Sequence, residues 1–79
     1  MKQFNVTVFR KKLNNPLNEN EGFEQVFYTR WRGVTNFRTM INYLDSNVPD
    51  WWYINVYARP SRENLGRIYT DTRRYHHFL

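Results

Sequence analysis

Few side chains in this sequence are of the types that most often act in catalysis, and their spacing predicts no catalytic pair. Seven carboxylates fall mostly in predicted loops and at the ends of predicted elements: Glu19, Glu21, Glu24, Asp45, Asp50, Glu63 and Asp71. General acid–base catalysis needs two titratable groups held close together, as neighbours on one strand or helix face would be. No two of these carboxylates lie at i, i+2 on a predicted strand or at i, i+4 on the predicted helix, so the sequence indicates no acid–base site.

The sequence also has no recognisable motif for metal binding, for a phosphate-binding loop or for thiol chemistry. His76 and His77 are adjacent in a predicted extended tail, where neighbouring side chains point to opposite faces, so they are poorly placed to bind one metal ion. Gly22, Gly33 and Gly66 are isolated and form no phosphate-cradling loop, and the absence of cysteine removes thiol chemistry. We therefore predict a protein that is not an enzyme, with no catalytic residues, no metal site and no cofactor.

Charge and aromatic content are the features that point to a partner. The 79 residues include 12 Lys and Arg, nine of them Arg, against 7 Asp and Glu, and the net charge is +5. Aromatic residues make up 19% of the chain. A basic surface favours nucleic acid, anionic lipid or an acidic protein surface as partner, and Arg suits bidentate phosphate contacts better than Lys does.

The sequence carries no pattern typical of export or of a membrane span. Residues 1–5 are not followed by the apolar run of a secretory signal, and no stretch approaches the roughly 18 apolar residues that cross a bilayer. We expect a cytoplasmic protein with no membrane partner.

The first part of the chain is predicted to form two strands joined by a loop. Period-two alternation predicts a strand over residues 3–11, and an aromatic and β-branched run predicts another over 23–34. Residues 12–22 are dense in Asn with one Pro and one Gly, which predicts a mobile loop. In the second strand we place Phe27 and Trp31 inward, because the opposite choice would bury two arginines.

The rest of the chain is predicted to form one helix and two more strands. An Asn that is a good N-cap opens a helix over 36–47, and Pro49 prevents its continuation. Apolar residues recur on one helix face: Phe37, Met40, Ile41 and Leu44. Alternation predicts strands over 51–59 and 65–73, and residues 74–79 form a tail that either frays or docks.

The predicted element order is ββαββ in a single domain of residues 1–79. One helix covers only one face of a four-stranded sheet, so we predict a two-layer α+β domain with an open sheet face. Two hairpins with a central crossover resemble the β-grasp arrangement, in which the first and last strands lie side by side in the middle. This resemblance rests on element order alone, and a ferredoxin-like variant or another α+β sheet stays open.

The open face is predicted to carry Tyr and Arg side chains. If Ile54, Val56 and Ile68 point inward, alternation turns the residues between them outward. With the second strand, the outward set is Tyr28, Arg30, Arg32, Tyr53, Asn55, Tyr57, Arg59, Arg67, Tyr69 and Arg73. Bases stack on aromatic and guanidinium surfaces while cations follow the phosphates, so we predict a site for single-stranded DNA or RNA. The same residue types also suit the solvent face of any stable sheet.

A protein-binding module is the alternative prediction. Trp51 and Trp52 are adjacent, so only one faces the core, and alternation puts Trp52 inward. Trp51, Tyr53 and Tyr57 would then form an aromatic interface for an acidic or host protein, or for a second copy of the chain. In the other interpretation, Trp51 seals the core beneath Val48. Ten Asn and one Ala in a small basic domain would suit a phage or mobile-element inhibitor.

Overall fold

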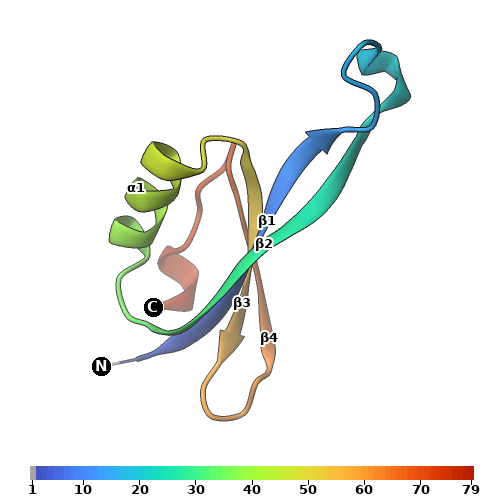
Figure 1. Cartoon of the computed structure of the whole chain (residues 1–79). Coiled ribbons are helices and arrows are strands. Elements are labelled where there is room, and N and C mark those ends of the chain that lie inside the picture. The colour runs from blue at the N-terminus through green and yellow to red at the C-terminus, as the bar shows by residue number, and fades with distance from the viewer. Residues whose placement is uncertain (1) are drawn as a thin grey trace.

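The computed structural model describes residues 2–79, which form a four-stranded sheet with one helix on one face (Figure 1). The elements are β1 (Phe4–Leu13), β2 (Phe23–Val34), α1 (Phe37–Asn47), β3 (Trp51–Ala58) and β4 (Asn64–Tyr69), with short 3-10 turns at Glu19–Glu21 and His76–Phe78. The predicted two-layer α+β class is confirmed. Two bounds differ from prediction by more than one residue: β1 continues two residues beyond residue 11, and β4 ends four residues before 73.

The order of the strands differs from the β-grasp arrangement. The sheet order is β2-β1-β3-β4, and every neighbouring pair is antiparallel. The strand beside β1 in the middle of the sheet is therefore β3, and β4 lies at the edge. The reason lies in the connections: β2 already occupies one side of β1, α1 returns the chain to the other side, and a tight turn then adds β4 outside β3.

The hydrophobic core lies between α1 and one face of the sheet. Asn36 caps the helix, since its side-chain oxygen accepts a hydrogen bond from the Thr39 amide at 3.0 Å. The predicted apolar stripe of α1 is buried against the two central strands. The whole core consists of Phe4, Val6, Val8, Phe37, Met40, Ile41, Leu44, Val48, Trp51, Ile54, Val56, Ile68 and Phe78.

A register shift in β2 reverses one of the predicted side-chain directions. Trp31 pairs with Val6 and packs against the core, as predicted. Phe27, however, pairs with Phe9 on the other side of a shift between Val8 and Phe9, and its side chain is 55% exposed. The prediction that Phe27 points inward is therefore wrong, because one extra residue in a strand inverts the alternation beyond it.

A second shift, in β3, exchanges the predicted roles of Trp51 and Trp52. The shift makes Trp51 pair with Arg10, and Trp51 is a core residue with 2% of its surface exposed. Its amide donates to the Val48 carbonyl at 2.9 Å, and its indole donates to Asp45 of α1 at 3.0 Å. Trp52 stays only half-buried. The alternative interpretation, that Trp51 seals the end of the core, is the one observed.

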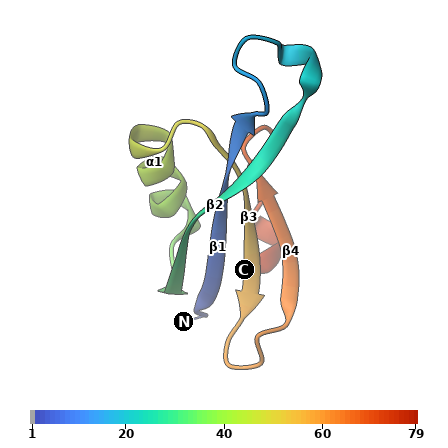
Figure 2. The same cartoon turned by 45° about the vertical axis from the view of Figure 1, so that its right-hand side comes forward.

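The C-terminal tail docks on the core beside the helix. Phe78 is buried, with its ring centroid 5.9 Å from that of Phe37, and Tyr75 packs against the same ring at 5.7 Å. The Lys2 ammonium donates to the Leu79 carbonyl at 3.2 Å. In Figure 2 this tail lies behind β3 and β4. It therefore covers the part of the core face that the single helix leaves free.

We expect the docked tail to contribute to stability in the same way as a core residue. Replacing Phe78 with Ala should lower the free energy of unfolding by about 3–5 kcal/mol, because a buried ring is lost and a cavity is left. Leu79→Ala, at an exposed position next to it, should cost less than about 0.5 kcal/mol. Denaturant unfolding of both variants measures the difference, and equal small losses would show that the tail is not docked.

Candidate functional site

The sheet face opposite α1 is organised in rows of side chains that cross the strands. The first row is aromatic and has one residue from each strand, Phe27, Phe9, Tyr53 and Tyr69, paired in register. Phe9 and Tyr53 are stacked with centroids 5.0 Å apart, and Phe27 meets the edge of Phe9 at 6.0 Å. The inner pair is thereby covered, while Phe27 and Tyr69 keep exposed surface at the two ends of the row.

The second row combines Arg30, Thr7, Asn55 and Arg67. Arg67 is held within the face: its Nε donates to Asn55 Oδ1 at 2.9 Å, and its guanidinium lies 4.4 Å from the centroid of Tyr53. A further hydrogen bond to the Tyr69 hydroxyl raises the pKa of Arg67. Asn55 and Tyr53 are 9% and 3% exposed. These predicted site residues therefore support the face and are covered by one another and by Arg67.

Beside this row the face is hollowed. The hollow has a volume of about 490 Å³ and lies over β2, β1 and β3, with the β3–β4 turn at its end. Its lining includes Asn5, Thr7 and Tyr57 from the central strands. Four arginines also line it: Arg30 and Arg32 from β2, and Arg59 and Arg62 from the turn. No carboxylate lies among the lining residues.

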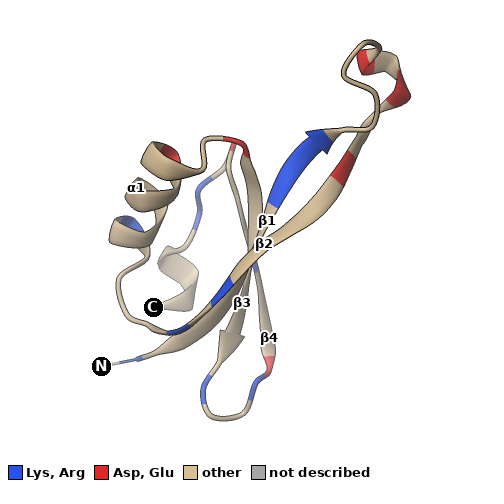
Figure 3. Ribbon diagram, in the orientation of Figure 1, with Lys and Arg blue, Asp and Glu red and all other residues tan. Residues whose placement is uncertain are grey.

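Positive charge in the hollow is uncompensated. Ion pairs among residues 2–79 join Arg10 to Asp50 at 2.7 Å and Arg73 to Asp45 at 2.6 Å, and none includes an arginine of the hollow. Among the described residues, the Arg59 side chain donates only to the neutral Gln3 side chain, at 2.9 Å. Figure 3 shows basic segments on β2 and at the β3–β4 turn, while acidic residues mark the far tip of the β1–β2 hairpin. The hollow is therefore suited to an anion.

The floor of the hollow contains an unusual hydroxyl. Thr7 belongs to the central strand β1 and is only 7% exposed, yet its Oγ1 has no hydrogen-bond partner among the described residues. Most buried hydroxyls in proteins are hydrogen-bonded, since an unpaired one keeps the cost of losing its water. The Oγ1 atom is itself closed to solvent, so this hydroxyl is an unpaired polar group inside the sheet and not a group that a ligand in the hollow can reach.

Two predicted site residues do not line the hollow, and for Arg73 the predicted position on the open face is wrong. Tyr28 is the extra residue at the β2 register shift, so it has no partner in β1 and does not line the hollow. β4 ends at Tyr69 and the chain turns, so alternation does not reach Arg73. Arg73 instead pairs with Asp45 of α1, on the core side.

Arg62, by contrast, was not predicted. It lies in the turn between β3 and β4 at a φ of 65°, where strand periodicity says nothing about side-chain direction. The only signal is its place in a basic turn that follows Arg59 and Pro60.

The predicted aromatic interface for a protein partner keeps only one of its members at the surface. Trp51 and Tyr53 are buried, at 2% and 3% exposed, and Tyr57 is half-buried in the wall of the hollow. These three residues therefore present no continuous aromatic patch.

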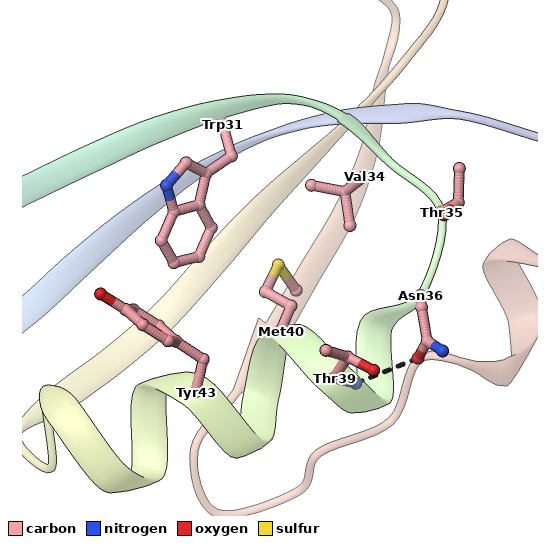
Figure 4. Close-up of a pocket in the computed structure, with 7 residues that line it drawn as sticks. All are labelled: Trp31, Val34, Thr35, Asn36, Thr39, Met40 and Tyr43. Carbon is pink, nitrogen blue, oxygen red and sulfur yellow. Dashed lines mark hydrogen bonds between the residues drawn. The ribbon is translucent and has the colours of Figure 1, made fainter.

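A second hollow, of about 480 Å³, lies between β2 and α1 (Figure 4). Trp31 points from the strand toward Met40 and Tyr43 of the helix, and the Trp31 and Tyr43 rings meet edge to face at 5.7 Å. Its lining has no charged side chain. This second hollow offers apolar surface but no charged group that could bind the negatively charged partner expected from the composition. We therefore take the arginine-lined hollow as the candidate site.

Metal ligands, membrane-spanning helices and similarity to known proteins are the remaining features that bear on the site. Within residues 2–79, no group of three or more His, Asp or Glu side chains is placed to hold a metal ion. No helix in this part of the chain is long and apolar enough to cross a membrane. No protein-family model, curated protein or solved structure matches the chain.

The pairing of Asp45 predicts a pH dependence of stability. Hydrogen bonds from Arg73 and then Trp51 hold the pKa of Asp45 below its usual range. Its contribution is therefore present above the ordinary carboxyl pKa of about 4 and is lost as the pH falls through the lower folded value. At pH 7, Asp45→Asn should lower the free energy of unfolding by about 0.2–1 kcal/mol, since the pair is partly exposed. Unfolding curves measured down to about pH 3 should show this difference shrinking; a constant difference would contradict the assignment.

Proposed function

We propose that this protein binds single-stranded nucleic acid on its open sheet face, without catalysing a reaction. The observation that carries the proposal is the gathering of Arg30, Arg32, Arg59 and Arg62 around one hollow that has no carboxylate in its lining. Guanidinium groups contact phosphate oxygens through two parallel hydrogen bonds, and a basic groove follows a nucleic-acid backbone.

Aromatic surface is available for the bases beside this charge. Tyr57 lies in the wall of the hollow, and Phe27 and Tyr69 are 55% and 37% exposed on the same face. Stacking on aromatic rings requires unpaired bases, whereas the bases of a duplex are stacked on one another. The face therefore suits a single strand.

The β1–β2 hairpin argues against insertion into a duplex. A two-stranded ribbon of this kind fits the major groove of DNA. Its tip, however, carries Glu19 and Glu21, and Glu24 lies at the start of β2; these carboxylates would repel phosphates (Figure 3). We therefore expect weaker binding to a duplex than to a single strand of the same length.

Salt dependence tests the role of the arginines. Arg30→Ala and Arg59→Ala should each lower the slope of log affinity against log salt by about 0.7, if each contacts one phosphate of a single strand. Arg38→Ala removes the same charge from the exposed side of α1 and serves as the matched control. Fluorescence anisotropy with single-stranded DNA and RNA, at several salt concentrations and beside a duplex, measures these slopes. Absence of binding at low salt, or an equal effect of Arg38→Ala, would refute the site.

A different substitution isolates stacking from charge. Tyr57→Ala should weaken single-strand binding by about 1–3 kcal/mol through lost base stacking, with the salt slope nearly unchanged. Tyr57→Phe keeps the ring and should keep most of the affinity. If Tyr57→Ala binds as tightly as the original chain, the attraction is only that of a basic surface, and a protein with an acidic surface becomes the better candidate partner.

A further inference from the structure

Strand β2 is one of the two edges of the sheet, and much of the exposed apolar surface of the protein lies on it. Within residues 2–79 only β1 pairs with β2, so the other side of β2 presents unpaired backbone N–H and C=O groups. Four large hydrophobic side chains of this strand are between 36% and 55% exposed: Phe23, Val26, Phe27 and Tyr28. The other edge strand, β4, has six residues against twelve in β2. A long edge with exposed apolar side chains is a surface to which a further strand can be added.

The two halves of this edge differ in what lies beside them on the helix side. Residues 29–34 run next to α1, and the apolar hollow lined in part by Trp31, Met40 and Tyr43 opens between strand and helix (Figure 4). Residues 23–27 belong to the outer part of the β1–β2 hairpin, which extends beyond the helix (Figure 1). One half of the edge therefore has a groove with no side chain to fill it, and the other half has apolar side chains with no groove.

Val26 and Trp31, one from each half, lie on the same side of the sheet. Val26 pairs with Arg10, which pairs in turn with the buried Trp51, so this row lies on the helix side. Trp31 pairs with Val6 of the core and lies on that side as well. Residues directly opposite each other in an antiparallel pair have their side chains on the same side. Val26 of one copy of the chain can therefore stand opposite Trp31 of a second copy, at the mouth of the apolar hollow.

The same alignment of two β2 strands also suits the open side of the sheet. It places Phe27 opposite Arg30, both of which lie in rows on the open face, and a guanidinium beside an aromatic ring is a favourable contact. Arg32 then lies opposite the neutral Gln25, with Glu24 as the next residue along the strand. An alignment centred on Arg30 would instead place two arginines directly opposite each other, which is destabilising. The order of charges along β2 therefore favours antiparallel pairing in this one register.

We infer that two copies of this chain associate through antiparallel pairing of their β2 edges, with residues 25–27 of each copy opposite residues 30–32 of the other. The two paired segments lie on either side of a two-fold axis near Tyr28, where the bulge in β2 interrupts the ladder. Val26 of each copy then covers the apolar hollow beside Trp31 of the other. The two sheets become one continuous sheet, with both helices on one side and both open faces on the other.

The mass of the protein in solution tests the inference. Sedimentation velocity over a wide range of concentrations should show the mass rise from 9.8 kDa to twice that value. Val26→Lys should raise the dissociation constant of the dimer by at least about tenfold, because its ammonium would enter the apolar hollow of the other copy. Leu65→Lys is the matched control, since Leu65 has the same exposed fraction of 37% on the opposite edge of the sheet, and it should dimerise like the original chain. A monomer at every concentration, or equal effects of the two variants, overturns the inference.

Disulfide trapping tests the register, because the chain has no cysteine of its own. Phe27→Cys and Arg30→Cys, both at exposed positions, are oxidised separately and as an equimolar mixture. The mixture should form a covalent dimer, since residues 27 and 30 of different copies lie opposite each other. Each variant alone should form little, because two copies of the same residue are then about 10 Å apart along the strands, beyond the reach of a disulfide. Equal trapping in all three samples overturns the register.

These measurements are independent of strand binding. They use no nucleic acid, so a dimer can be found even if the proposed function fails, and single-strand binding can be found on a chain that stays monomeric.

Discussion

One helix cannot cover both faces of a four-stranded sheet, and most features of this protein follow from that constraint. On the core side, α1 and the C-terminal tail together cover the sheet, and Val6, Val8 and Ile54 are fully buried. On the other side no element of residues 2–79 packs over the strands, so the side chains of the sheet must protect it themselves. The central strand β1 is nevertheless enclosed on both faces, since Thr7 is only 7% exposed.

The two halves of the open face are covered by their own side chains in different ways. In one half, aromatic rings stack across the strands and Arg67 lies over Tyr53, so apolar surface is covered by neighbours and by a cation that stays in contact with water. In the other half, arginines stand around a hollow and leave the Thr7 hydroxyl unpaired. The first half is covered by its own side chains, whereas the second keeps its positive charge with no carboxylate among the lining residues.

The helix and the four strands could be predicted from the sequence because the spacing of the apolar residues depends directly on which face of each element is buried. Alternation also placed Arg30, Asn55 and Arg67 on the open face, since these residues lie where the pairing is regular. It failed at the shifts between Val8 and Phe9 and between Phe9 and Arg10, because a single extra residue inverts the side-chain directions beyond it. Phe27 is misplaced for this reason.

The remaining differences involve segments without any period. Trp51 and Trp52 exchanged roles at a shift that no local residue type announces, and Arg73 follows a turn that ends β4 early. The docking of Phe78 and the position of Arg62 depend on contacts between distant parts of the chain. The shape of the candidate site, as distinct from its residue types, therefore became visible only in three dimensions.

The ion pairs distinguish the arginines of the hollow from the other arginines of the protein. Arg10 and Arg73 each have a carboxylate partner, and those pairs link β1 to the start of β3 and α1 to the chain after β4. Among residues 2–79 the arginines of the hollow have none, although Glu63 directly follows Arg62 in the sequence. Like charges repel one another, and an anion bound among these arginines would reduce that repulsion. A ligand that binds only the folded chain stabilises it by mass action, so an anion that bound in the hollow would raise the free energy of unfolding.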